Sequence, residues 1–452
     1  MVKILQYGEG NFLRAFADTY FDTLNREQGG YQVYAVKPRP GGSVETFRRQ
    51  GCRYHVILRG ISEGQAIEQA RQIDVLQDVI HPFEDEDAYY ALASDPELKL
   101  IVSNTTEAGI CFCADDRPED IIHCTFPARL TLFLHRRFAA GCAGVYLLPT
   151  ELIDRNGEAL FTCVDRYISL WQLGEDFRRW NRESCFYCDT LVDRIVSGYP
   201  KDPETLAHLE ALLGGPDPLM TVAEPFGLWV IQNKGALAQL LPTGRHDIDV
   251  VLTDNVSAYK ERKVRLLNGS HTNLVAAGLL MGVKTVAQCM AHDALSAFID
   301  RTLKQELLPF VPGGAGFAED VMLRFRNPYL HHQLGGIALN SISKWRARLL
   351  PTFRDYFARF GRIPPHITVG FSCLMALYHS SEAENGCYYA PLPGGRLQLQ
   401  DDPKYLARLA GGSIPAFLAD STVWGEDLTA YPGFCDTVCA NVEALARGET
   451  LL

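Results

Sequence analysis

Residues 2–14 read Val2-Lys3-Ile4-Leu5-Gln6-Tyr7-Gly8-Glu9-Gly10-Asn11-Phe12-Leu13-Arg14, and this stretch decides the fold of the first half of the chain. Val2 to Tyr7 predicts a strand, and Asn11 to Leu24 predicts the helix after it. Glycines in such a turn let the backbone approach a pyrophosphate at the positive end of a helix. Leu13 replaces the third glycine of the full GxGxxG fingerprint, so a plain tight turn stays a second interpretation. The candidate cofactor ligands here are Gly8, Gly10, Asn11, Phe12 and Leu13.

Further β-rich runs alternate with helical stretches, which predicts an α/β fold with a Rossmann-like parallel sheet over residues 1–253. The predicted strands are Tyr31 to Val36, Leu98 to Ser103 and Gly144 to Leu148. In open α/β sheets, ligands gather outside the carboxyl ends of the strands. Asn104 and Thr105 follow one of these strands directly, so both join the candidate cofactor ligands.

The end of the second strand bears on the choice of cofactor. A dinucleotide-binding sheet usually carries an acidic residue there, which binds a ribose hydroxyl of NAD. This chain has Lys37 instead, with Arg39 close by. The residues alone therefore favour a 2′-phosphate and NADP.

From about Asp254 onward, helical periodicity dominates, and 452 residues exceed the size of one ordinary domain. We expect a mostly α-helical domain over residues 254–452, with the active site between the two domains. The predicted helices are Tyr259 to Leu280, Lys284 to Gln305, Gly336 to Leu350 and Thr368 to Ser381.

The composition excludes some classes of partner. A formal net charge of -11 argues against nucleic acid and anionic membranes, which both reward a basic surface. The N-terminus lacks the pattern of a signal peptide, and the apolar run from Leu274 to Val283 is too short to span a bilayer. We therefore expect a cytoplasmic protein with a small-molecule substrate.

The thirteen cysteines are typical of reduced thiols. One group could be interpreted as a zinc site: Cys111, Cys113, His123, Cys124, Cys185 and Cys188. Its spacing matches zinc ligands poorly, and buried cysteine is also a common small apolar residue. We predict no metal.

The segment Tyr259 to Thr272 carries the candidate catalytic residues. On a regular helix Lys263, Asn268 and His271 fall within about 140° of arc. Carbonyl reduction needs a proton donor, hydrogen bonds to the developing alkoxide and a group that orients the substrate, and these three residue types can supply them. Gly269 in this helix suggests the close approach of another backbone or a ligand. A surface helix with solvated basic residues and a buried histidine is the competing interpretation.

The order Lys-x4-Asn-x2-His from Lys263 to His271 resembles the catalytic signature of the polyol-specific long-chain dehydrogenases, the family that includes mannitol dehydrogenase. The resemblance implies that the lysine is the general acid/base, that asparagines form an oxyanion hole and that the histidine holds the substrate. Val192-Asp193-Arg194-Ile195 and the arginine-bearing turn Arg324 to Pro328 match further family motifs. Asn156-Gly157 also matches, which implies that Asn156 is a second oxyanion donor.

Within the family, the chain looks most like the tagaturonate reductases. Gly8 to Phe16, Ser103 to Ile110, Thr190 to Pro200 and Tyr259 to Lys263 carry this resemblance. It implies metal-free, reversible reduction of the C5 ketone of tagaturonate by NADH, and NAD(H) is therefore the predicted cofactor. Glu151 stands in a segment where mannitol dehydrogenases have Cys-Asp-Asn, which favours a uronate over a polyol. The candidate substrate residues are Asp193, Arg324, His332, Lys344 and Glu151, with a cation expected for the carboxylate.

Three alternatives stay open. A mannonate (fructuronate) or mannitol oxidoreductase would use the same machinery with a different pocket. A nucleotide-binding regulator without activity would keep only the fold, and a zinc-dependent dehydrogenase would use the cysteine group.

Overall fold

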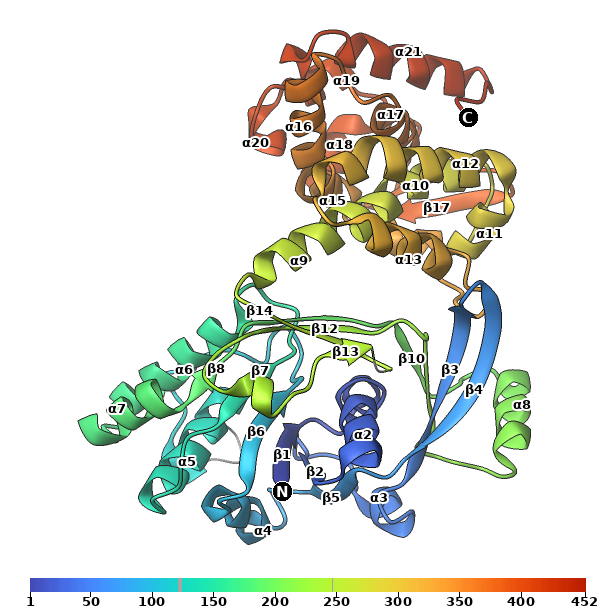
Figure 1. Cartoon of the computed structure of the whole chain (residues 1–452). Coiled ribbons are helices and arrows are strands. Elements are labelled where there is room, and N and C mark those ends of the chain that lie inside the picture. The colour runs from blue at the N-terminus through green and yellow to red at the C-terminus, as the bar shows by residue number, and fades with distance from the viewer. Residues whose placement is uncertain (121–123, 246) are drawn as a thin grey trace. The chain divides into compact units, whose positions relative to one another are not determined.

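The computed structural model describes residues 1–120, 124–245 and 247–452. They form two compact units, Met1–Tyr259 and Lys260–Leu452 (Figure 1). The division falls inside helix α9 (Val256–Lys263), and each unit is described by itself.

Unit 1 is built on a six-stranded sheet in the order β5-β2-β1-β6-β7-β8, and every neighbouring pair is parallel. The predicted Rossmann-like parallel sheet is therefore confirmed. Its strands are β1 (Val2–Tyr7), β2 (Tyr31–Val36), β5 (Leu76–Ile80), β6 (Leu98–Ser103), β7 (Tyr146–Pro149) and β8 (Phe186–Tyr187). β7 begins two residues later than expected. The backbone of Gly144, just before it, packs so closely on Ser184 that a Cβ would lie 1.9 Å from its carbonyl oxygen.

Apolar residues of the sheet alternate between two separate cores, as the two-residue period of a strand requires. On β1, Ile4 packs into the core that includes helix α2 (Ala17–Gln28), whereas Leu5 packs into the core that includes α5 (Phe126–Ala139). Both faces of the sheet are thus covered, which is the condition for a parallel sheet.

The helix predicted from Asn11 to Leu24 is broken, so that prediction is wrong in detail. Four residues form α1 (Asn11–Arg14), and α2 begins at Ala17. Phe16 leaves the helical conformation, with φ -130° and ψ -85°. Its ring then packs 5.0 Å from that of Phe12 and 5.5 Å from that of Trp229, measured between ring centroids. Long-range aromatic packing therefore overrides the local helical periodicity here.

Two smaller sheets complete unit 1, and the sequence pattern did not predict either. One has the order β10-β11-β3-β4 and the other β13-β14-β12-β9. Their strands are β3 (Tyr54–Ser62), β4 (Gln65–Ile73), β9 (Thr190–Asp193), β10 (Val196–Gly198), β11 (Thr221–Ala223), β12 (Leu228–Gln232), β13 (Gly244–Arg245) and β14 (Asp249–Thr253). The remaining helices of this unit include α3 (Glu45–Arg49), α4 (Glu86–Ala91), α6 (Asn156–Leu170), α7 (Glu175–Ser184) and α8 (Pro203–Leu213).

Unit 2 is mostly helical, as expected. Helix α10 (Gly269–Leu280) is almost entirely buried and lies against α17 (Pro365–His379), which in turn packs on α21 (Phe434–Ala446). Gly370 makes the first contact possible, because a Cβ there would lie 2.0 Å from Oδ1 of Asn273. The other helices include α11 (Val286–Ala291), α12 (Asp293–Arg301), α13 (Ala315–Phe325), α14 (Leu334–Ile337), α15 (Ser341–Arg348), α16 (Leu350–Phe360), α18 (Pro403–Leu409), α19 (Ile414–Leu418) and α20 (Ser421–Trp424).

Two predicted helices of this unit are wrong in their extent. The run from Lys284 to Gln305 is divided by His292, whose ψ of 116° is extended. The run from Gly336 to Leu350 is divided between α14 and α15, where Asn340 adopts a left-handed φ of 53°. A small antiparallel sheet was also not predicted: β15 (Glu382–Glu384), β16 (Cys387–Leu392) and β17 (Gly395–Leu399). Among the residues that the structure describes, no helix is long and apolar enough to cross a membrane.

Asp18 of α2 makes the stability of unit 1 depend on pH. The side chain is fully buried, and its Oδ2 accepts a hydrogen bond of 2.6 Å from the Tyr54 hydroxyl. Burial raises the pKa of Asp18 to about 7, even though the hydrogen bonds from Tyr54 and Gln6 lower it. An unfolded aspartate has a pKa near ~3.9, so between about pH 4 and 7 the native state binds one more proton than the unfolded state. Stability must then fall with rising pH, by about 1.4 kcal/mol per pH unit from this group.

We expect Asp18→Asn to remove this part of the slope, because the amide does not ionise and its oxygen still accepts from Tyr54. Urea unfolding at pH 5, 6 and 7 should show that the wild type loses stability relative to the variant as pH rises. Parallel pH dependences for the two proteins would contradict the assignment.

Candidate active site

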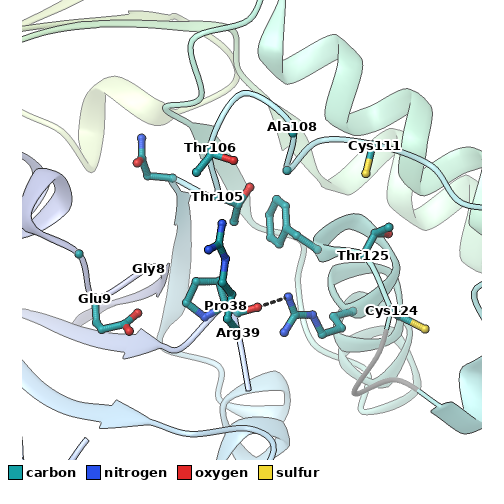
Figure 2. A pocket seen from close by; sticks show the side chains of 15 residues that line it. Gly8, Glu9, Pro38, Arg39, Thr105, Thr106, Ala108, Cys111, Cys124 and Thr125 are labelled. Atoms are coloured by element: carbon teal, nitrogen blue, oxygen red, sulfur yellow. Dashed lines mark hydrogen bonds between the residues drawn. The ribbon is translucent and has the colours of Figure 1, made fainter. Parts of the chain in front are cut away.

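A cavity of about 530 Å³ opens at the carboxyl ends of β1 and β6 in unit 1 (Figure 2). Four of the predicted cofactor residues line it, namely Gly8, Gly10, Asn104 and Thr105. The other residues that line it are Glu9, Pro38, Arg39, Thr106, Ala108, Gly109, Cys111, Cys124, Thr125, Phe126 and Arg129. The volume is in the usual range for a small-molecule or cofactor site.

Gly8 is required by the shape of this turn. Its φ of +133° is one that residues with a side chain rarely adopt. A Cβ at Gly8 would also lie 3.1 Å from Leu13 Cδ1 and 3.4 Å from the carbonyl oxygen of Asn104. The backbone is thus free of side chains where a phosphate would approach, which fits a nucleotide cofactor.

The other three predicted ligands of the turn do not line the cavity. Leu13, at the third fingerprint position, is buried and packs against Gly8. Phe12 stacks on Phe16, and Asn11 Oδ1 accepts a hydrogen bond of 2.8 Å from Arg14. The structure therefore gives these side chains packing and turn-stabilising contacts rather than contacts with the cavity.

Glu151 and Thr105, which the sequence assigned to different ligands, are hydrogen-bonded to each other. Glu151 Oε1 accepts from the backbone N–H of Thr105 at 2.9 Å and from its hydroxyl at 2.8 Å. Oε2 accepts from the Ser103 hydroxyl at 3.0 Å. Burial raises the pKa of Glu151, while these hydrogen bonds lower it. In this structure the carboxylate holds the loop after β6, and its predicted contact with substrate stays a prediction.

Asn156 is also tied to the protein backbone. Its Nδ2 donates to the carbonyl oxygens of Pro149, Glu151 and Thr190 at 2.9 to 3.2 Å, and its Oδ1 accepts from the Thr190 N–H at 2.8 Å. The side chain is only 1% exposed. This arrangement favours a structural role, in which Asn156 joins the end of β7 to the start of β9. An oxyanion donor would need Nδ2 to exchange one of these carbonyls for substrate.

Asp193 and Arg194, at the end of β9, lie in different surroundings. Asp193 is the last residue of the strand and is buried. Arg194 is buried as well and donates to the carbonyl oxygens of Ala15 and Glu224, at 2.8 and 2.9 Å. Burial lowers the pKa of Arg194 to about 10. Arg194 therefore fixes the strand against the α1–α2 junction, and the substrate contact expected of Asp193 stays a prediction.

In unit 2 the segment from Lys263 to His271 does not have the regular helical geometry that was expected. Lys263 ends α9, Val264–Asn268 (η4) is a π-helical turn, and Gly269 begins α10. A π turn closes i→i+5 hydrogen bonds, so residues five apart lie one above the other along the helix. Lys263 and Asn268 are five apart and lie at the two ends of this turn. The unusual winding therefore brings them closer to one face than a regular α-helix would, and such π turns are frequent at functional sites.

His271 lies in the first turn of α10 among aromatic and positively charged side chains. Its ring stacks on Phe325 with 4.2 Å between centroids and meets His332 edge-on at 5.1 Å. Burial lowers the pKa of His271 well below its ordinary value, so the imidazole is neutral. The neighbouring charges that lower this pKa further belong to His332, Arg324 and Arg348. The structure thus brings together three of the predicted residues, His271, Arg324 and His332.

Arg348 is a candidate that the sequence analysis missed. It stands one helical turn after Lys344 on α15, and its guanidinium donates to the Thr272 hydroxyl at 3.2 Å. Burial lowers the pKa of Lys344, and the nearby Arg348 lowers it further. Lys344 also donates to the carbonyl oxygen of Ile337 at 2.9 Å. The i, i+4 spacing of the two cations was the signal in the sequence. This group of cations could bind an anionic part of a substrate.

No other backbone that the structure describes approaches Gly269 unusually closely, and the approach of a ligand that its position suggested stays a prediction. A Cβ there would lie 3.4 Å from Leu349 Cδ2 and 3.5 Å from the carbonyl oxygen of Arg348, which are ordinary contacts. Gly269 also has helical φ and ψ of -62° and -47°.

We therefore expect Gly269→Ala to keep or raise the free energy of unfolding, by up to about 1 kcal/mol. Gly370→Ala is the matched comparison and should cost about 3 kcal/mol, since its Cβ would overlap Asn273. Thermal and urea unfolding of both variants measure this. A large loss in Gly269→Ala would mean that the site requires the glycine.

The cysteine group shows no sign of a metal centre where it is described. All thirteen cysteines are free thiols, and His123 lies outside the described residues. Over the described ranges, no three His, Cys, Asp or Glu side chains are arranged to hold a metal ion. Cys111 and Cys124 line the cavity of unit 1, whereas Cys185 and Cys188 are buried.

Comparison with known proteins decides the family. A sequence model of the mannitol dehydrogenase Rossmann domain matches residues 2–242, and a model of the mannitol dehydrogenase C-terminal domain matches residues 255–446. The chain belongs to the mannitol dehydrogenase family. It is therefore an oxidoreductase that acts on a CH–OH group, of the polyol dehydrogenase type, and the family fold implies a nucleotide cofactor and a small sugar substrate.

Relatives and solved structures agree with this assignment. An altronate oxidoreductase of Yersinia enterocolitica is 38% identical over 98% of this chain and 94% of its own length. An altronate oxidoreductase of Bacillus subtilis is 37% identical over 96% and 91%. The resemblance to this branch of the family is thus confirmed.

Two solved structures share the fold. A mannitol 2-dehydrogenase of Pseudomonas fluorescens, in complex with NAD and D-mannitol, matches with a TM-score of 0.66 and 21% identity, over 99% of this chain and 92% of that one. A D-sorbitol dehydrogenase matches with a TM-score of 0.82 and 20% identity, over 99% and 94%.

Proposed function

We propose that the chain catalyses the reversible reduction of the C5 ketone of tagaturonate to altronate, with NADH as the hydride donor. The observation that carries this proposal is a group of cations in unit 2. Arg324 and Arg348 lie around the neutral His271, and Lys344 lies near Arg348. A uronate differs from a polyol or a ketose by its carboxylate, and guanidinium groups bind carboxylates with two parallel hydrogen bonds. The altronate oxidoreductases that are 37 and 38% identical to the chain support the same substrate class.

Bound NADH would supply the hydride, and the protein would supply the proton and the positioning. In this proposal the Nζ of Lys263 donates a proton to the oxygen of the reduced ketone and removes it in the reverse direction. Asn268, five residues further along the π turn, hydrogen-bonds to that oxygen as negative charge develops. Burial lowers the pKa of His271 well below its ordinary value, and in this proposal its imidazole holds a substrate hydroxyl while Lys263 exchanges the proton.

The substrate carboxylate would be bound by Arg324, with Arg348 and Lys344 as the neighbouring cations. Asp193 would accept hydrogen bonds from substrate hydroxyls. In unit 1 the Gly8 turn and the cavity beside it would hold the cofactor. Because Glu151 and Asn156 are bound to the backbone around β6, β7 and β9, we propose that they keep these loops in place.

The decisive measurement is the loss of NADH absorbance when purified protein meets tagaturonate, with fructuronate, fructose and NADPH in parallel assays. We expect fast oxidation of NADH with tagaturonate alone. Turnover with fructuronate or fructose instead would assign a different substrate to the same catalytic machinery and overturn the proposed specificity. If neither NADH nor NADPH is oxidised with any of these ketoses, the non-catalytic alternative would be favoured.

A further inference from the structure

The end of β2 has an ion pair where a dinucleotide-binding sheet usually has a single acidic residue. Lys37 follows the strand directly, is 7% exposed, and places its Nζ 3.0 Å from Oε1 of Glu9. Glu9 belongs to the glycine turn after β1, the neighbouring strand in the sheet. The positive charge that the sequence showed at this point is therefore neutralised by a carboxylate from the next loop.

Glu9 lines the cavity, whereas Lys37 is buried and does not line it. Glu9 lines the cavity together with Pro38 and Arg39 (Figure 2). Its backbone is held as well, because the carbonyl oxygen of Glu9 accepts a hydrogen bond of 3.1 Å from Arg14 Nε. Lys37 thus holds the carboxylate of Glu9, and Arg14 holds its main chain. A carboxylate held in this way is pre-organised to accept hydrogen bonds from a ligand.

We propose that Glu9, oriented by Lys37, binds the adenosine ribose hydroxyls of NAD(H) in place of the missing strand-end acid, and so selects NAD(H) over NADP(H). This inference rests on the proposed function. A carboxylate accepts from both ribose hydroxyls, but it repels a 2′-phosphate, which has negative charge and offers no comparable hydroxyl there. Arg39 would attract that phosphate, so the two residues oppose each other. Glu9 decides the outcome because its carboxylate is held at the cavity by Lys37, whereas Arg39 is exposed.

The test measures cofactor binding without substrate, by the change in nicotinamide fluorescence on titration with NADH and with NADPH. We expect the wild type to bind NADH more tightly. Glu9→Gln should weaken NADH binding by roughly 10-fold, the usual effect of losing a hydrogen bond to a charged acceptor. It should also strengthen NADPH binding, because Lys37 is then left without its counterion. Glu45→Gln, which removes a carboxylate paired with Arg49 on exposed α3, should change neither affinity.

A second probe keeps the test independent of the variant. NADH that lacks the 2′-hydroxyl of the adenosine ribose should bind the wild type about 10-fold more weakly than NADH, and this difference should be clearly smaller in Glu9→Gln, whose neutral amide is the weaker acceptor. An unchanged ratio of NADH to NADPH affinity in Glu9→Gln, or a wild type that ignores the 2′-hydroxyl, would overturn the role of Glu9. A wild type that binds neither cofactor, or prefers NADPH, would instead refute the proposed use of NAD.

Discussion

Replacing Lys263 by alanine is expected to lower kcat by about 1,000-fold while the Kd for NADH changes by less than about twofold. General acid–base catalysis contributes roughly 100- to 10,000-fold, and the variant removes the only group proposed to protonate the nascent alkoxide. Cofactor affinity should survive, because the cavity proposed to hold the cofactor is lined by residues of unit 1. The change should therefore appear in kcat far more than in binding.

Three comparisons make this result interpretable. Lys304→Ala removes an exposed lysine of the same unit, paired with Asp300, and should leave kcat unchanged. Lys263→Arg keeps the positive charge but cannot release its proton, so it should be as slow as the alanine variant. Added primary amines should restore part of the rate of Lys263→Ala. An equal loss of NADH affinity and turnover would mean that Lys263 has a structural role.

The sequence predicted the parts of the fold that local pattern controls. β1, β2 and β6 begin and end where the apolar runs and their polar ends indicated, because buried parallel strands read as continuous apolar segments. The two smaller sheets of unit 1 escaped prediction since most of their strands have only two to five residues and make sense only once they pair. The break at Phe16 escaped for a related reason, since its partner Trp229 is more than 200 residues away.

In the candidate site too, the sequence could not predict contacts between residues far apart in the chain. Residue types and spacing singled out the glycine turn and the segment from Lys263 to His271, but they could not tell which polar atoms are already used by the protein. Asn156 meets Thr190 and Glu151 meets Thr105 only in the folded chain. The π turn after Lys263 has no sequence signature of its own, although it brings the lysine and Asn268, which are five residues apart, closer to one face.

Arg324→Gln is expected to weaken binding of tagaturonate by roughly 100-fold and binding of fructose by less than about threefold. Loss of one partner of a buried charge pair costs about 2 to 5 kcal/mol, and only the uronate offers a carboxylate to lose. Arg324 is 7% exposed and close enough to His271 to lower its pKa, so an anion bound there would be largely shielded from solvent. Shielding makes such an ion pair stronger than one at the surface.

Calorimetric titration of each ketone in the presence of NAD⁺, which cannot reduce it, measures binding without turnover and separates carboxylate recognition from general damage. Arg348→Gln should show the same selectivity with a smaller loss if the carboxylate also contacts the second guanidinium. Arg354→Gln, which removes an exposed arginine paired with Glu426, should alter neither ligand. If Arg324→Gln weakens tagaturonate and fructose alike, the arginine supports the fold and the carboxylate is bound elsewhere. A loss of affinity for tagaturonate but not for fructose would instead show that the contact with Arg324 makes a polyol dehydrogenase fold prefer a sugar acid.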